Sequence, residues 1–440
     1  MQKLKFIDLY SGLGGFHVGL SRLGHECVLA CEIQEELRKI YTKNFPNTPI
    51  VSNVLGIDSS KLPDFEVMCA GFPCQPFSRA GSRKGFNDER GNHFFKLIEI
   101  IKIKKPRFIF LENVETLLRH DGGRTFRVIK DLLSEANYDI KYSILSPHEY
   151  NIPQHRRRIF IVGKDRQYGN LDYFKWPEKE SQLKTVINYV NAEFNGLSGE
   201  NLYLSDYKTQ VVKFWNDFIE NFPKSKEFPS HPIWSQEWKA NYPFKEFYNQ
   251  EILLEDLIGY KGAFGKTITE RRIDNGELDN LIPRYSFQRK SSPLMPKWKI
   301  NFINKNRLFY KNNKDYIDQF LKERPELKTF FFSDQKLEWN CSGEEKTLND
   351  KLIQFRASGL RVKKASWIPA LNTINTQTIF FPIINRKLSA FELIKFQNLQ
   401  ELNYFPGIEQ NRFVGNGGVR ALGNAVNSKL VELIGKNLLR

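Results

Sequence analysis

Apolar runs and amphipathic stretches alternate over the first 165 residues. The apolar runs predict strands at residues 3–10, 26–32, 65–71, 107–114 and 156–163. Apolar side chains at helical spacing predict helices at residues 16–24, 33–45, 93–105 and 122–136. Buried strands that alternate with helices indicate an α/β fold with a doubly wound, mostly parallel sheet.

The regular alternation stops near residue 170. From there to about residue 385, aromatic and proline-rich stretches such as EFPSHPIWSQEWKANYPFKEFY follow no clear period, so the order of elements stays open. Helical character returns at the C-terminus, in SKLVELIGKNLL, after the turn sequence GNGGVRALGNAVN. We therefore expect two domains, one built from residues 1–175 and 411–440 and a smaller, irregular one from residues 176–410.

Composition fits a soluble globular protein, with 440 residues, 40% hydrophobic and 14% aromatic. No apolar stretch approaches the roughly 18 residues that span a bilayer, and MQKLKFIDLYSGLGG runs directly into a strand pattern rather than a signal peptide. The five cysteines, at 27, 31, 69, 74 and 341, are too few and too unpatterned for a disulfide framework or a metal site. We expect an intracellular, cytoplasmic protein with no membrane contact and no metal.

The charge is strongly basic, with a formal net charge of +16 from 66 basic and 50 acidic residues. This balance favours a polyanionic partner, nucleic acid first, although basic proteins also occur for solubility alone. Residues 281–310 and 351–390 each carry seven Lys or Arg and no Asp or Glu. Both stretches are interleaved with aromatics or amides, so we expect them to contact phosphates and bases.

A glycine-rich turn, DLYSGLGGF, follows the first predicted strand at residues 8–16. Gly12 and Gly14 fit the dinucleotide fingerprint Gly-x-Gly-x-x-Gly, but His17 stands at its third position. The turn could therefore serve a nicotinamide dinucleotide, a smaller adenosyl ligand or no ligand. Glu32 ends the second strand, where a carboxylate could bind ribose hydroxyls or simply precede a helix.

Cys74 points to a specific chemistry more clearly than the glycine-rich turn does. It lies in AGFPCQPFS, after the third predicted strand and between Pro73 and Pro76. The prolines stiffen the loop and keep it from continuing as helix or sheet. The thiol could be a small buried hydrophobe, or it could act as a thiolate nucleophile beside the cofactor turn.

Charged residues mark two further strands. Glu112 in LENV stands at the end of the fourth strand, where an apolar environment would raise its pKa and let it hold a proton, unless it caps a helix. Arg156 and Arg158 in PQHRRRIF share one face of an extended segment. They could clamp an anion or a carbonyl oxygen, or form surface ion pairs.

The motifs DLYSGLGGF, GFPCQPFS, ENV, QHRRR and GNAV, in this order, resemble the DNA cytosine-5 methyltransferases of bacterial restriction-modification systems. The resemblance covers residues 1 to about 165 and 386 to 440. It implies a Rossmann-like domain whose glycine-rich turn holds S-adenosylmethionine, which has no pyrophosphate to bind.

The resemblance also implies a cofactor pocket. Its residues would be Tyr10, Gly12, Leu13, Gly14, Glu32, Ile33, Asn53, Val54, Pro73, His93, Asn424 and Val426. Two of these depart from the family pattern. Asn53 stands where the family usually has an adenine-binding aspartate, and His93 replaces a usual leucine. The amide of Asn53 would accept from the adenine amine more weakly than a carboxylate.

By the same resemblance, Cys74 would add to C6 of a cytosine flipped out of the duplex. Glu112 would hydrogen-bond the N3 edge and the exocyclic amine, and Arg158 would hold O2, while Arg156 would support the nucleophile loop. Methyl transfer to C5, loss of the C5 proton and expulsion of the thiolate would complete the cycle.

The middle of the chain would then be a target-recognition domain, with RKLSAFELIKFQNL at residues 386–399 resembling the ninth family motif as its last part. The expected partner is double-stranded DNA, with a cognate restriction endonuclease acting separately. Residues expected to contact DNA are Gln75, Ser78, Arg289, Lys297, Arg361, Lys363 and Thr373; Thr373 would replace the threonine of the family's Thr-Leu pair.

Two alternatives stay open. A tRNA cytosine-5 methyltransferase would use the same chemistry, but such relatives usually have Pro-Pro-Cys where this chain has Phe72-Pro73-Cys74. A catalytically silent nucleic-acid-binding regulator is disfavoured by the intact Cys74, Glu112, Arg156 and Arg158.

Overall fold

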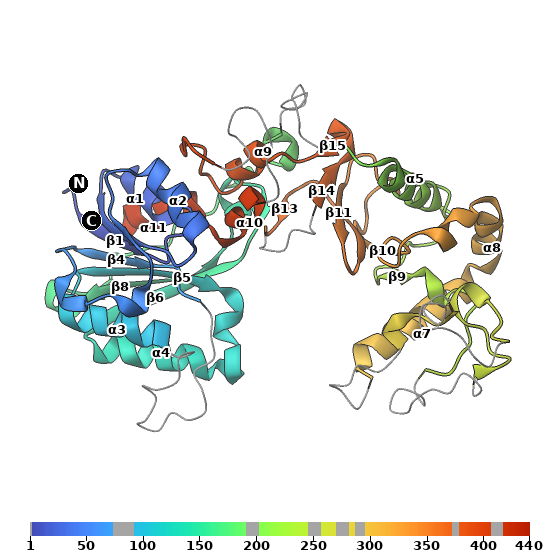
Figure 1. Ribbon diagram of the computed structural model, residues 1–440, viewed down its shortest axis with the longest axis horizontal. Coiled ribbons are helices and arrows are strands. Elements are labelled where there is room, and N and C mark those ends of the chain that lie inside the picture. The colour runs from blue at the N-terminus through green and yellow to red at the C-terminus, as the bar shows by residue number, and fades with distance from the viewer. Residues whose placement is uncertain are drawn as a thin grey trace. The chain divides into compact units, whose positions relative to one another are not determined.

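The computed structural model describes residues 2–73, 92–190, 202–244, 257–269, 281–286, 295–371, 378–405 and 417–440. Five predicted site residues lie outside these ranges: Cys74, Gln75, Ser78, Arg289 and Thr373. The chain forms two compact units (Figure 1). The first contains residues 1–200, 366–375 and 388–440, and the second contains residues 201–365 and 376–387.

The first unit is built around a seven-stranded sheet of order β3-β2-β1-β4-β5-β8-β6. The strands are β1 (Lys5–Leu9), β2 (Glu26–Cys31), β3 (Ile50–Val51), β4 (Val67–Ala70), β5 (Phe108–Val114), β6 (Tyr138–Leu145) and β8 (Arg158–Asp165). The pairs from β3 to β5 are parallel, and β8 runs antiparallel to both β5 and β6. The predicted α/β fold with a mostly parallel sheet is confirmed.

Helices cover both faces of this sheet (Figure 1). They are α1 (Gly15–Ser21), α2 (Glu35–Asn44), α3 (Asn92–Lys104), α4 (Arg124–Glu135) and α11 (Ser428–Leu438). Alternate residues of β5 enter different cores, because successive side chains of a strand point to opposite faces. Ile109 and Leu111 pack with α3 and α4, whereas Phe108 and Phe110 pack with α1 and α11.

The segment before α11 also belongs to the first unit. It contains α9 (Ala390–Lys395), which begins at a capping box of Ser389 and Glu392, and α10 (Gly417–Asn424). Ser428 N donates to the Gln397 carbonyl, and Arg22 donates to the Asn398 carbonyl. Residues 388–405 therefore contact α11 and the end of α1 and belong to the first unit, whereas the sequence placed the boundary near residue 411.

A short return strand belongs to this unit as well. β13 (Ile368–Pro369) pairs in parallel with β7 (Gln154–His155), so residues 366–375 are separated from the sequence around them. Sequence reasoning missed this return because a two-residue strand leaves no periodic pattern.

The second unit contains a six-stranded sheet of order β15-β14-β11-β12-β10-β9. The strands are β9 (Ile233–Trp234), β10 (Lys336–Asn340), β11 (Leu352–Arg356), β12 (Gly359–Lys363), β14 (Thr378–Phe381) and β15 (Arg386–Lys387). Its helices include α5 (Asp206–Glu220), α7 (Lys297–Asn312) and α8 (Lys314–Glu323). Phe214, Trp215 and Phe218 of α5 are fully buried in a core that is separate from those of the first unit.

Within the described ranges, every helix is too short or too polar to span a lipid bilayer.

Candidate active site

Three of the predicted site residues, Tyr10, Glu112 and Val426, lie together around Gly71, at the edge of the sheet where β1 and β4 end. Gly71 follows β4, and a Cβ placed on it would lie 3.8 Å from Glu112 Oε2, 3.8 Å from the Tyr10 carbonyl oxygen and 3.6 Å from Val426 Cγ2. Carboxyl ends of parallel strands are the usual place for ligands in open α/β sheets. The fold thus gathers side chains that are more than 400 residues apart along the chain.

The glycine-rich turn between β1 and α1 needs its glycines for two different reasons. Gly12 and Gly14 have φ angles of +54° and +82°, which L side chains rarely adopt. A Cβ on Gly15 would lie 2.2 Å from the carbonyl oxygen of Val426, so any side chain there would collide with the C-terminal GNAV segment. Glycine is therefore favoured by the backbone conformation at Gly12 and Gly14, and by the close contact with the GNAV segment at Gly15.

Glu32 ends β2 and is buried. Its Oε2 accepts from Gly12 N at 3.0 Å, and its Oε1 accepts from Gln34 N at 2.8 Å. The carboxylate thus joins the glycine-rich turn to the start of α2, so both roles weighed from the sequence are compatible with its position. Each oxygen keeps a further lone pair for a ligand hydroxyl. Beside it, Ile33 is 64% exposed and offers an apolar surface.

The two departures from the family pattern have definite partners. Asn53 Oδ1 accepts from Leu55 N at 3.0 Å and caps a short 3₁₀ turn that begins with the buried Val54. His93 Nδ1 lies 2.9 Å from the hydroxyl of Tyr10. Since this hydroxyl and the imidazole hold one another, His93 fixes the Tyr10 side chain in a way that a leucine could not.

Glu112 and Arg158 form an ion pair, with Arg158 Nε 3.1 Å from Glu112 Oε1. Burial raises the pKa of the Glu112 carboxyl, and the positive charges of Arg158 and Arg156 partly offset this effect. A buried carboxyl of this kind can keep a proton closer to neutral pH than an ordinary glutamate does. The role predicted for Glu112 stays a prediction.

Arg156 is buried and holds backbone carbonyls. Its guanidinium donates to Leu371 O at 3.0 Å, Gly423 O at 2.9 Å and Ala425 O at 3.0 Å. Arg156 therefore holds the GNAV segment in place. The sequence predicted that Arg156 supports the loop of Cys74, and this loop lies outside the described residues. Burial lowers the pKa of this guanidinium to about 9, so it stays charged at neutral pH.

Two polar residues of the site escaped sequence reasoning. Asn113 Nδ2 donates to Phe72 O at 2.9 Å and so ties β5 to the segment that leads to Cys74. Asp8, in the middle of β1, is fully buried, and its Oδ2 accepts from His17 N at 3.3 Å. Burial raises the pKa of Asp8 to about 8. Both residues could have been suspected as polar side chains within apolar strands.

No group of three or more His, Cys, Asp or Glu side chains in the described ranges could hold a metal ion. Cys27, Cys31, Cys69 and Cys341 are buried free thiols.

The predicted DNA-contacting residues that are described lie in the second unit and differ in their surroundings. Lys297 is exposed at the start of α7. Arg361 Nε lies 2.9 Å from Glu338 Oε1, so its charge is paired within the unit. Lys363 is partly buried, and this burial lowers its pKa.

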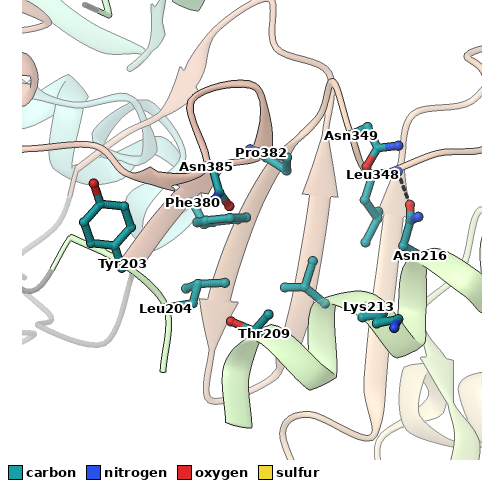
Figure 2. A pocket seen from close by; sticks show the side chains of 11 residues that line it. Tyr203, Leu204, Thr209, Lys213, Asn216, Leu348, Asn349, Phe380, Pro382 and Asn385 are labelled. Atoms are coloured by element: carbon teal, nitrogen blue, oxygen red, sulfur yellow. Dashed lines mark hydrogen bonds between the residues drawn. The ribbon is translucent and has the colours of Figure 1, made fainter. Parts of the chain in front are cut away.

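A cavity of about 490 Å³ also opens in the second unit, between α5 and the sheet (Figure 2). Leu204, Val212 and Phe380 line it, together with polar groups such as Thr209 and Lys213. None of the predicted site residues lines this cavity.

The strand order, the glycine-rich turn and the buried carboxylate after β2 define a Rossmann-like domain of the kind that binds adenosyl cofactors. The sequence matches the family described as C-5 cytosine-specific DNA methylase over residues 4–440, and the chain belongs to this family.

Similar proteins are type II methyltransferases. M.HhaI of Haemophilus parahaemolyticus is 39% identical over 184 residues, which cover 42% of this chain and 55% of that protein. M.Bsp6I of Bacillus sp. (strain RFL6) is 40% identical over 296 residues, covering 66% and 88%. The chain spans about half the length of the first curated relatives that it matches.

A solved structure supports the fold. A putative DNA modification methyltransferase encoded within a prophage of E. coli matches with a TM-score of 0.51 and 17% identity over 99% of both chains.

Proposed function

We propose that this protein transfers a methyl group from S-adenosylmethionine to C5 of a cytosine flipped out of a specific double-stranded DNA sequence. It would act as the modification enzyme of a restriction-modification system, with a separate cognate endonuclease. The observation that carries the proposal is the buried Glu112–Arg158 pair beside Gly71, three residues before Cys74. The family membership and the type II relatives support it.

The first unit fits the proposed cofactor. The backbone at Gly12 and Gly14 leaves room for close approach, Glu32 can accept from ribose hydroxyls, and the exposed Ile33 can pack against adenine. Asn53 Oδ1 already accepts one backbone bond, which leaves one lone pair for the adenine amine. S-adenosylmethionine supplies an electrophilic methyl group when bound.

The chain's own residues would activate the cytosine. Cys74, as a thiolate, adds to C6 and makes C5 nucleophilic. Glu112 in its protonated form donates to N3 and stabilises the charge that develops on the ring, while Arg158 holds O2. After the methyl group has moved to C5, the C5 proton leaves and the C6–sulfur bond breaks, which regenerates the thiolate.

The second unit would supply target recognition. The proposed DNA contacts are Lys297, Arg361 and Lys363. They also include four residues outside the described ranges: Gln75, Ser78, Arg289 and Thr373. Because Arg361 is paired with Glu338, we expect it to contribute less to phosphate binding than the exposed Lys297 does.

Transfer of a tritiated methyl group from S-adenosylmethionine to duplex DNA and to tRNA tests this function. We expect label in DNA and none in tRNA. If only tRNA is labelled, the substrate is tRNA and not DNA. If neither nucleic acid is labelled, the protein is better explained as a nucleic-acid-binding regulator without catalytic activity. Bisulfite sequencing of DNA from expressing cells would then identify the methylated site.

A duplex carrying 5-fluorocytosine at that site tests the covalent step. The fluorine cannot leave as a proton does, so the enzyme and DNA should stay joined on a denaturing gel. Absence of the adduct with active enzyme would contradict the addition mechanism.

A further inference from the structure

Helix α7 of the second unit (yellow in Figure 1) has a composition that its packing does not explain. Its sixteen residues, KWKINFINKNRLFYKN, include no Asp or Glu. The buried side consists of Ile303, Asn306 and Phe309. The α7 face, defined as its exposed stripe beside Leu308, consists of Lys297, Trp298, Asn301, Asn304, Lys305 and Lys311.

The lysines of the α7 face have no acidic partner among the described residues. Lys297, Lys305 and Lys311 are exposed, and no ion pair within the described ranges engages them. The other basic stretch behaves differently. There, Lys351 pairs with Asp350, Arg356 and Arg361 pair with Glu338, and Lys364 pairs with Glu344. The acid-free composition of residues 351–390 is therefore compensated by acids from elsewhere. In α7, Arg307 on the partly buried side pairs with Glu237 at 2.9 Å, whereas no ion pair within the described ranges engages the three lysines of the α7 face.

The positions of the charges also work against helix stability. Lys297 lies in the first turn, where the helix dipole is positive and cations are unfavourable. The first turn carries no acidic residue. Charges that cost stability within the unit are better explained by an anion from outside it.

An aromatic cluster holds the first turn of α7 in place. The ring of Trp298 packs edge-on against Trp234 and Phe302, at centroid distances of 6.4 and 5.7 Å, yet Trp298 remains 55% exposed. Lys336 lies over the rings of Trp234 and Tyr285, and burial together with the charge of Lys299 lowers its pKa to about 8. The first turn of α7 thus lies against an aromatic cluster, with Lys299 and Lys336 close enough to interact.

We propose that the α7 face binds the DNA duplex, with Lys297, Lys305 and Lys311 on backbone phosphates and with Trp298, Asn301 and Asn304 directed at the sugar–base surface between them. This inference rests on the proposed function and specifies which part of the second unit meets DNA. Exposed lysines suit phosphates, and amide side chains can bond both phosphates and base edges.

The test compares two triple variants of the full chain. Lys297→Gln, Lys305→Gln and Lys311→Gln remove charge from the α7 face. Lys224→Gln, Lys322→Gln and Lys328→Gln remove the same charge from exposed positions of the same unit outside α7. Each is titrated with a fluorescent duplex of mixed sequence at several salt concentrations, and binding is followed by anisotropy.

The α7 triple should bind at least about tenfold more weakly at moderate salt. Its plot of log affinity against log salt should be shallower by up to about 2.7, since each phosphate contact contributes about 0.9. The control triple should stay within about twofold of wild type. Removing Lys297 from the first turn should not lower the melting temperature, so misfolding and lost binding are separable.

Equal behaviour of the two triples would overturn the proposal while leaving the methyltransferase function intact, provided that wild type labels DNA. A wild type that neither binds nor labels duplex DNA would overturn both. Unchanged DNA binding with weakened tRNA binding in the α7 triple would assign the face to RNA and likewise contradict the proposal.

Discussion

At the residue scale, the proposed chemistry depends on which acids keep their protons and which lose them. Cys74 must be ionised to attack, whereas Glu112 must be protonated to donate to N3. Burial favours the protonated form of Glu112, as its raised pKa indicates. The proposed chemistry therefore needs different environments for these two acids.

Replacing the nucleophile tests this assignment. Cys74→Ser should lower methyl transfer by more than about a hundredfold, because a serine hydroxyl is far less ionised than a thiol near neutral pH. Calorimetric S-adenosylmethionine binding by the same variant, which should stay within about twofold of wild type, serves as the control. Turnover within tenfold of wild type would exclude the role assigned to Cys74.

Asp8 should make the stability of the first unit pH-dependent. Its pKa rises from 3.8 to about 8 on folding because of burial, so the folded chain holds this proton more tightly than the unfolded chain does. The resulting stability is complete below pH 3.8 and is lost as pH rises through about 8. The nearby His17, whose pKa burial lowers to about 4, stays neutral across the upper part of this range.

Asp8→Asn removes this titration. Between pH 6 and 8, wild type should lose stability relative to the variant by up to about 1.4 kcal/mol per pH unit. Melting temperatures at pH 6, 7 and 8 would measure the difference. Parallel curves for the two proteins would mean that Asp8 does not titrate in this window.

At the element scale, the sequence predicted the strands that are buried on both faces and the helices that bury one apolar face. The pattern in FIDLY, VMCA and FIFLENV gave β1, β4 and β5 to within a few residues. β6 was missed because most of its side chains are only partly buried, so its apolar pattern is weak. The second unit could not be ordered, since its short strands pair across long stretches of sequence.

The close contact between the glycine-rich turn and the GNAV segment predicts the effect of a substitution at Gly15. Gly15→Ala would place a Cβ 2.2 Å from the Val426 carbonyl oxygen. Separating α1 from the GNAV segment should cost about 1–3 kcal/mol and weaken cofactor binding. Gly56→Ala is the matched control, because a Cβ there meets nothing within 4 Å. Thermal melts and cofactor titrations should therefore distinguish the two alanine variants, and equal results would contradict the packing argument.

At the scale of the whole molecule, the chain passes between the two units several times, yet each unit has its own core. The first unit is closed by its C-terminal segment, where Arg22 donates to the Ser428 hydroxyl and Arg156 holds the carbonyls of Gly423 and Ala425. The second unit packs α5 against its own sheet and helices. This organisation favours separate stability for the proposed catalytic and recognition functions.

Phe218→Ala tests that separation. Phe218 is fully buried among the rings of Trp215, Trp238 and Phe320, so its removal should destabilise the second unit by about 3–5 kcal/mol. We expect S-adenosylmethionine binding to stay within about threefold of wild type, because no described contact of Phe218 reaches the glycine-rich turn, while DNA methylation is lost. Phe110→Ala, in the core of the first unit, should instead abolish cofactor binding. Calorimetry should show an early, partial unfolding transition for Phe218→Ala. Loss of cofactor binding together with a single transition would show that the two units fold as one.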